Sequence, residues 1–127
     1  MKILVCCLLL SCASVVAQPM TDVRANLIAN AIFKIEGGTK TKHPYGILSI
    51  KTNNPRQVCI NTIKNNYIRW QEAGSHGDFF EFLGNRYCPC KKGVTILETQ
   101  CNKYWLPNLR KILRAKTYEQ FDKNMQN

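Results

Sequence analysis

Apolar side chains recur every three or four residues in several stretches, the spacing of helices with one buried face. The first stretch covers residues 22–35, where Thr21 or Asp22 can cap the start and Gly37-Gly38 follow the end. A second stretch begins at Asn53-Asn54-Pro55, which suits a helix start. Its apolar stripe consists of Cys59, Ile60, Ile63, Tyr67 and Trp70.

Two shorter helices and one extended segment complete the pattern. Asp78 can cap an aromatic third helix, and a last helix is expected over about residues 106–113, with Thr117 capping a final turn. Residues 39–52 are expected to be extended or hairpin-like, because a turn at His43-Pro44-Tyr45-Gly46 lies beside apolar residues 47, 48 and 50. The pattern predicts an α+β fold, mainly helical, with a small β segment after the first helix.

The first 17 residues have the features of a signal peptide. Met1-Lys2 supplies a positive charge, residues 3–10 are apolar, and small residues lead to Ala17. The apolar run is shorter than the roughly 20 residues that span a bilayer. We therefore expect a secreted or periplasmic protein with one domain over residues 18–127. In an alternative interpretation, Cys12 is the lipidated cysteine of a lipoprotein.

Removal of the signal peptide leaves four of the seven cysteines: Cys59, Cys88, Cys90 and Cys101. An exported chain with four cysteines is expected to form two disulfides. Cys88 and Cys90 are too close in sequence to bridge each other without strain, so Cys59 and Cys101 are their expected partners, in either order. A zinc site that includes His43 or His76 is the alternative, but neither histidine has finger-like spacing.

The chain is strongly basic, with 18 Lys and Arg residues against 8 Asp and Glu residues, a formal charge of +10 at pH 7. Such a charge favours anionic partners, which include wall polymers, membranes and nucleic acids, and it does not choose among them. No glycine-rich phosphate loop, serine nucleophile motif or metal-binding helix is visible, and no cofactor is expected. We expect a monomer.

Glu36 is the candidate catalytic residue. It ends the first predicted helix, follows Ile35 and precedes Gly37-Gly38. The negative end of the helix dipole and the apolar neighbours both disfavour the ionised carboxylate. A carboxyl group that keeps its proton can act as a general acid on a glycosidic oxygen. In the alternative interpretation, Glu36 is an ordinary solvated helix end.

The segment after Glu36 resembles the signature of the lysozyme-like lytic transglycosylases. Glu36-Gly37-Gly38 is followed by Tyr45-Gly46-Ile47-Leu48-Ser49-Ile50, where that family has Tyr-Gly-Leu-Met-Gln-Ile along the floor of its sugar cleft. Tyr87, in Leu83-Gly84-Asn85-Arg86-Tyr87, corresponds loosely to the family's cleft tyrosine. Ser49 stands in place of the usual Gln, and Gly37 in place of the usual Ser. The run from Ile35 to Pro89 is also similar to small exported phage and bacterial proteins of the lysozyme superfamily.

The resemblance implies a lysozyme-like fold and cleavage of the β-1,4 bond between N-acetylmuramic acid and N-acetylglucosamine in peptidoglycan. It implies catalysis by Glu36 and substrate binding by Tyr45, Gly46, Ser49 and Tyr87. It also implies a one-acid mechanism, in which the substrate's N-acetyl group assists and a 1,6-anhydro sugar forms. Asp78 or Glu81 could supply a second acid for ordinary hydrolysis, and Trp105, near Pro107, could be an exposed ring that contacts a ligand.

A non-catalytic module is the alternative to an enzyme. A cationic domain with two disulfides could bind an anionic wall polymer, or could inhibit a partner protein, with a degenerate cleft. Ser49 favours this alternative, because replacement of the family's Gln removes or changes a sugar contact.

Overall fold

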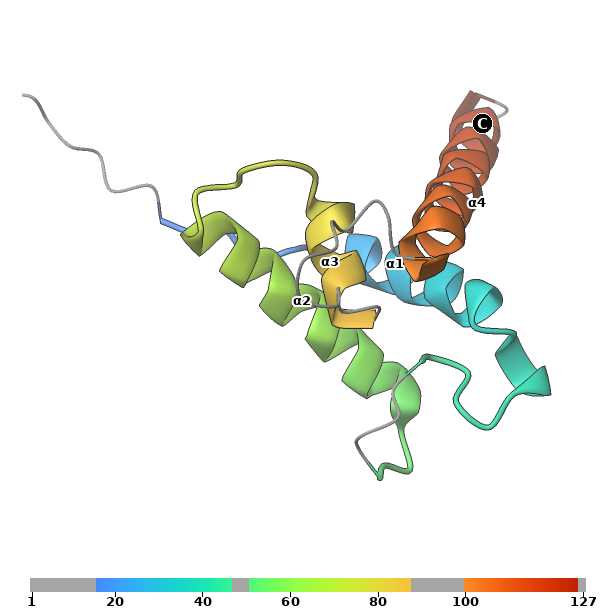
Figure 1. Ribbon diagram of the computed structural model, residues 1–127. Helices are drawn as coiled ribbons and strands as arrows, with labels where there is room; N and C mark the ends of the chain where they lie inside the picture. Colours follow the sequence, from blue (N-terminus) through green and yellow to red (C-terminus); the bar gives the residue numbers. More distant parts are fainter. Residues whose placement is uncertain (1–15, 47–50, 88–99, 126–127) are drawn as a thin grey trace, which may run out of the picture.

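The computed structural model describes residues 16–46, 51–87 and 100–125, and in these ranges it is helical (Figure 1). Four α-helices and one short 3-10 helix follow one another in the described residues. They are α1 (Asp22–Ile35), η1 (Gly38–Lys40), α2 (Pro55–Glu72), α3 (Phe79–Tyr87) and α4 (Gln100–Met125).

The two ends of α1 confirm the sequence prediction. Thr21 is the N-cap, and its hydroxyl oxygen accepts a hydrogen bond from the Arg24 backbone N–H at 3.4 Å. Gly37 and Gly38 follow the helix with φ values of +92° and +56°, a left-handed backbone that glycine adopts without strain. The chain turns sharply there, and Glu36 is left as the last residue before the turn.

Local capping also defines α2 and α3. The Asn54 side chain accepts a hydrogen bond from the Gln57 backbone N–H at 3.1 Å, and Pro55 occupies the first turn of α2. Asp78 accepts a hydrogen bond from the Phe80 backbone N–H at 2.6 Å at the start of α3. These caps confirm the predicted starts of both helices.

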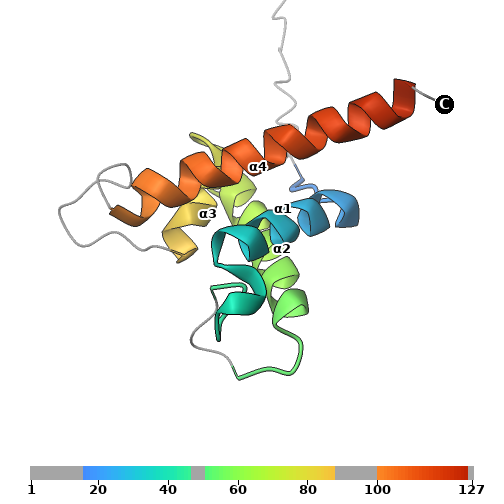
Figure 2. The same ribbon diagram turned by 90° about the vertical axis from the view of Figure 1, so that its right-hand side faces the viewer.

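The fourth helix is longer than the sequence pattern predicts. It runs over 26 residues, and its C-terminal half extends past α1 and away from the other helices (Figure 2). Thr117 lies inside α4, so the prediction that it caps a separate turn was wrong. Pro107 lies within the helix, where it removes one backbone donor but does not end it.

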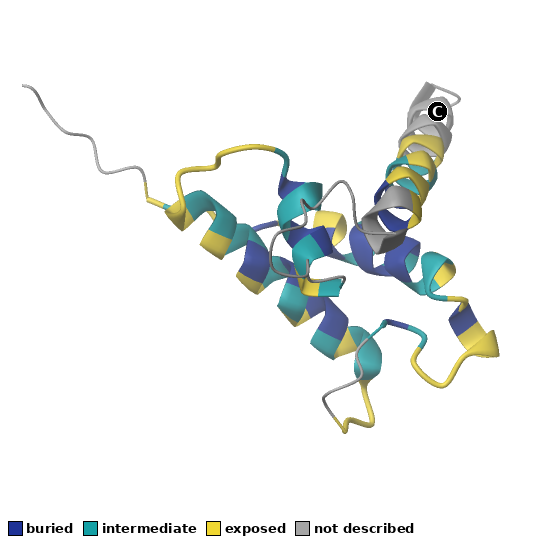
Figure 3. Cartoon of the chain, in the orientation of Figure 1, coloured by how far each residue is buried: buried dark blue, intermediate teal, exposed yellow. Residues whose placement is uncertain are grey.

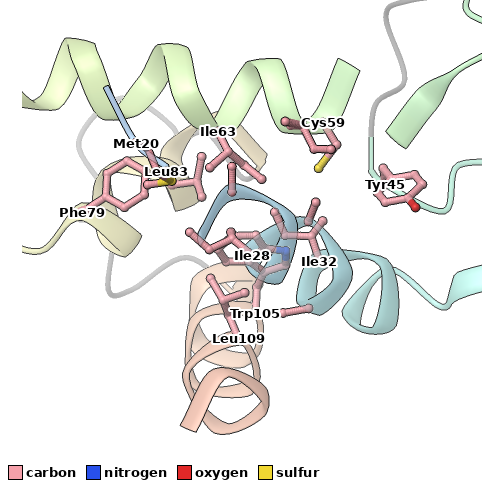
Figure 4. Close-up of a cluster of buried hydrophobic side chains, with 14 of the residues drawn as sticks. Met20, Ile28, Ile32, Tyr45, Cys59, Ile63, Phe79, Leu83, Trp105 and Leu109 are labelled. Carbon is pink, nitrogen blue, oxygen red and sulfur yellow. The ribbon is translucent and has the colours of Figure 1, made fainter. Parts of the chain in front are cut away.

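The core lies where α1 packs against both α2 and α4, while α3 contacts the same two helices. Each helix contributes buried side chains to one cluster (Figures 3 and 4). Its largest fully buried members are Ile28 and Ile32 of α1, Cys59 and Ile63 of α2, Leu83 of α3, and Leu106 and Leu109 of α4. The apolar stripe predicted for the second helix therefore faces the core, and so does most of the stripe predicted for the first, in which Val23 is exposed instead.

The prediction of a mainly helical protein is confirmed, and the structure differs over the predicted β segment. Residues 38–40 form the 3-10 helix and residues 41–46 form bends and a turn, so the described part of this segment contains no strand. The left-handed glycines and the turn at residues 43–46 prevent a regular extended backbone there. Residues 47–50 lie outside the described residues.

The chain joins the helical body just after the predicted signal peptide. The Gln18 backbone N–H donates to the Gln71 side chain at 2.6 Å, and the Gln71 amide donates back to the Gln18 carbonyl at 3.0 Å. Met20 is buried in the core. Residues 1–15, which hold most of the predicted signal peptide, lie outside the described residues. Among the helices described, none is both long and apolar enough to cross a bilayer.

Candidate active site

Three distant parts of the chain meet at the Glu36 carboxyl group. A Cβ atom built on Gly46 would lie 2.9 Å from the Glu36 carboxyl carbon and 3.1 Å from the Tyr87 ring. Both distances are shorter than normal contacts, so a side chain at residue 46 would require Glu36 and Tyr87 to shift. The structure therefore brings together Glu36, Gly46 and Tyr87, three of the five candidate residues in the active-site prediction.

Trp105 is the fourth component of this group, which we call the Glu36 site. Its indole nitrogen donates a hydrogen bond to Oε1 of Glu36 at 3.0 Å. The sequence left open an exposed ring at this position, but Trp105 is buried, with only 7% of its surface exposed. Trp105 is 69 residues from Glu36 in sequence. No local pattern could pair the two, although an indole N–H that is buried does need an acceptor.

Tyr87 links Trp105 to α2. Its ring stacks on the Trp105 ring, with centroids 5.2 Å apart and an interplanar angle of 22°. Its hydroxyl oxygen lies 3.3 Å from the Cys59 sulfur atom. Burial raises the pKa of the Tyr87 hydroxyl well above its ordinary value, and the nearby Cys59 and Glu36 contribute in the same direction. Tyr87 is therefore neutral at any physiological pH.

Cys59 carries a free thiol in the structure. Burial raises the pKa of this thiol from 9.0 to about 11, against the opposing effects of the Tyr87 hydrogen bond and the Arg56 charge. Cys88 and Cys90 lie outside the described residues, and of Cys101 only the backbone, in α4, is described. The two predicted disulfides therefore stay a prediction.

Tyr45 is held beside the site as a packed side chain. It is 9% exposed, and its ring centroid lies 5.2 Å from that of Phe33. This contact fixes the turn that carries Gly46 against the end of α1. The remaining candidate, Ser49, lies outside the described residues.

The other two candidate acids are engaged elsewhere. The carboxylate of Asp78 accepts from Arg110 at 2.6 Å, and that of Glu81 lies 3.6 Å from the same guanidinium group. Asp78 and Glu81 precede Tyr87 by nine and six residues, so they lie about 13 Å and about 9 Å away along the α3 axis. In the described residues, no second carboxylate contacts Glu36.

A separate cavity of about 590 Å³ lies between α1, α3 and α4. Arg24, Arg110 and Arg114 line it together with apolar side chains, and Asp78 neutralises only one of these charges. Neither Glu36 nor Tyr87 borders this cavity. His43 and His76 are exposed, and no group of potential metal ligands was found among the described residues.

Comparison with known proteins found no match: no family model, no curated protein and no solved structure is similar to this chain.

Proposed function

We propose that this protein is an exported peptidoglycan-cleaving glycosidase, a lytic transglycosylase in which Glu36 is the general acid of a lysozyme-like fold. One observation carries the proposal. The Glu36 carboxyl group lies against Gly46 and Tyr87, which are two of the positions where the sequence resembles that family. Residues that match a motif in sequence thus also lie together in space.

The environment of Glu36 suits general acid catalysis. The side chain is half-buried, so the carboxyl group is partly shielded and still reachable from solvent. The Trp105 hydrogen bond fixes its orientation. A general acid must be held within hydrogen-bond reach of the oxygen that it protonates, and a fixed carboxyl group meets that condition.

The proposed reaction needs one protein carboxyl group. Glu36 gives its proton to the glycosidic oxygen, and the bond from that oxygen to C1 of N-acetylmuramic acid breaks. The substrate's N-acetyl oxygen stabilises C1 until the C6 hydroxyl attacks it. That hydroxyl returns its proton to Glu36, so the product is a 1,6-anhydro sugar and no water is consumed. The Arg110 pairing of Asp78 and Glu81 favours this scheme over one with two acids.

The charge of the protein fits the same substrate. A formal charge of +10 at pH 7 attracts the chain to anionic wall polymers. The predicted signal peptide would export the protein to the compartment that contains peptidoglycan. The protein would act there as a monomer.

Digestion of purified peptidoglycan tests the proposal. The soluble fragments are analysed by mass spectrometry, and we expect fragments that end in 1,6-anhydro sugars, each lighter by one water than a hydrolytic product. Fragments with ordinary reducing ends would show that the protein is a glycosidase that hydrolyses the bond, as a lysozyme does, and not a transglycosylase. The absence of any fragments would contradict the proposal.

The arginine-lined cavity favours a second candidate function, that of a cationic module that binds an anionic wall polymer without cleaving it. Of the three arginines that line it, Arg24 and Arg114 have no carboxylate partner among the described residues. Binding of peptidoglycan in a pelleting assay, with no release of soluble fragments, would support this candidate instead.

A further inference from the structure

Among the described residues, the Trp105 indole is the one hydrogen-bond donor to the Glu36 side chain. We infer that Trp105 is a positioning residue: it holds Oε1 of Glu36 and thereby makes Oε2 the oxygen that delivers the proton. The delivery of the proton rests on the proposed function of Glu36. The hydrogen bond from Trp105 and the position of the proton on Glu36 are independent of that function.

The chemistry of the indole group determines the choice of oxygen. An indole N–H can donate a hydrogen bond but cannot accept one. When Glu36 is protonated, its carbonyl oxygen is a better acceptor than its hydroxyl oxygen, so the arrangement with the carbonyl oxygen toward the indole is favoured. Since Oε1 lies 3.0 Å from the indole nitrogen, this arrangement leaves the proton on Oε2.

The packing around Oε1 leads to the same conclusion. Oε1 is the carboxyl oxygen nearest Gly46, where a Cβ atom would lie only 3.0 Å away. Trp105 and Gly46 together occupy the surroundings of Oε1, and no substrate oxygen can approach it from these directions. Oε2 has no hydrogen-bond donor among the described residues.

The indole itself is held in one orientation. Trp105 stacks on Tyr87, and its neighbours Leu106 and Leu109 are buried in the core. After proton transfer, the same indole donates to a negatively charged oxygen, and such a bond is stronger than one to a neutral carboxyl group. The contact therefore strengthens as the reaction proceeds, which is the condition for it to raise kcat rather than only to improve binding.

NMR tests the hydrogen bond without any need for activity. The chain has two tryptophans, so ¹⁵N-labelled protein shows two indole N–H signals, and Trp70→Phe identifies them. We expect the Trp105 signal to respond to pH, because the acceptor of its hydrogen bond is a carboxyl group. The Glu36→Gln variant, whose amide oxygen still accepts from the indole, should abolish that response.

Burial raises the pKa values of Cys59 and Tyr87, so both stay neutral. The Glu36→Gln variant separates the response of Glu36 from that of any other ionisable group near the site, such as His43 in the turn that carries Gly46. A Trp105 signal that does not respond to pH, or one that responds equally in Glu36→Gln, would overturn the inference.

Kinetics test the positioning role. Trp105→Phe keeps an aromatic ring against Tyr87 but removes the donor, so kcat should fall about 10-fold to 100-fold while KM changes little. A purely structural role would not produce this split between kcat and KM. Trp70→Phe is the matched control, since the Trp70 indole donates to the His76 carbonyl instead.

The outcomes separate the two proposals. An unchanged kcat in a folded Trp105→Phe protein would overturn the positioning role. A wild-type protein that does not cleave peptidoglycan would overturn the proposed function together with the delivery step, and the indole signal would then test only the hydrogen bond between Trp105 and Glu36.

Discussion

The hydroxyl oxygen of Tyr87 lies 3.3 Å from the sulfur atom of Cys59, and this contact joins α3 to α2 beside the Glu36 site. Both groups are largely withdrawn from solvent, and both have raised pKa values. Because Tyr87 also stacks on Trp105, the contact connects the core of α2 to the residue that holds Glu36.

The raised pKa of Cys59 makes stability depend on alkaline pH. The folded-state pKa, about 11, lies above the ordinary value of 9.0, so the stabilisation is complete below pH 9 and is lost as the pH rises toward 11. This difference corresponds to roughly 3 kcal/mol. Urea unfolding between pH 8 and 11 should show the decline, and Cys59→Ala should reduce its slope. An equal slope in both proteins would contradict the assignment.

The same thiol should be unreactive in the folded protein. A buried thiol with a pKa of about 11 is almost entirely protonated at neutral pH, and only the thiolate is nucleophilic. Iodoacetamide at neutral pH should leave Cys59 unmodified in the native protein and should modify it in urea. If Cys59 resists modification in urea until a reductant is added, it forms one of the two predicted disulfides instead.

Gly46→Ala should disturb the Glu36 site through its methyl group. Gly46 has a φ of +67°, where any other residue is strained by about 1–2 kcal/mol, and the new Cβ would lie 2.9 Å from the Glu36 carboxyl carbon. The carboxyl group would have to move away from Trp105, so we expect at least about a 10-fold loss of activity beyond the effect on stability.

Gly77→Ala is the matched control for this steric effect. Gly77 has a similar φ of +71°, but a Cβ there meets no atom within 4 Å. The backbone strain is thus shared, and the contact with Glu36 is not. Thermal unfolding and peptidoglycan digestion by both variants separate the two effects, and equal activities would show that the methyl group at residue 46 is harmless.

Asp78→Asn tests the one-acid mechanism. The variant removes the negative charge that pairs with Arg110 but keeps an oxygen for the Phe80 cap. We expect activity within about 3-fold of the wild type and a loss of stability of at most about 1 kcal/mol, because the ion pair is partly exposed. A loss of activity of about 100-fold without unfolding would indicate that Asp78 is a second catalytic acid.

The sequence predicted those parts of the structure that depend on local signals. The caps at Thr21, Asn54 and Asp78 and the glycines after Glu36 act within a few residues, and they place the starts of three helices and the end of α1. The length of α4 was missed, because the apolar pattern indicated a helix only over about residues 106–113, whereas α4 runs from Gln100 to Met125.

The site could be predicted only in part, because one of its main contacts joins segments that are far apart in sequence. Glu36, Gly46 and Tyr87 were identified from motif-like segments, and the structure brings them together. The Trp105 hydrogen bond depends on how α4 packs on α1, and packing over 69 residues leaves no pattern in a single sequence. The prediction of a β segment was wrong for the described residues, because it was based on the apolar residues beside the turn, which suggested strands.

The central claim is that Glu36 is the general acid, and the rate at which Glu36→Gln releases soluble fragments from peptidoglycan tests it most directly. Gln keeps the size of the side chain and an acceptor for the Trp105 indole, but it has no proton to transfer. We predict a rate about 10²-fold to 10⁴-fold below that of the wild type, with unchanged thermal stability. Glu72→Gln, at the exposed end of α2, should retain full activity. A Glu36→Gln protein as active as the wild type would contradict the account.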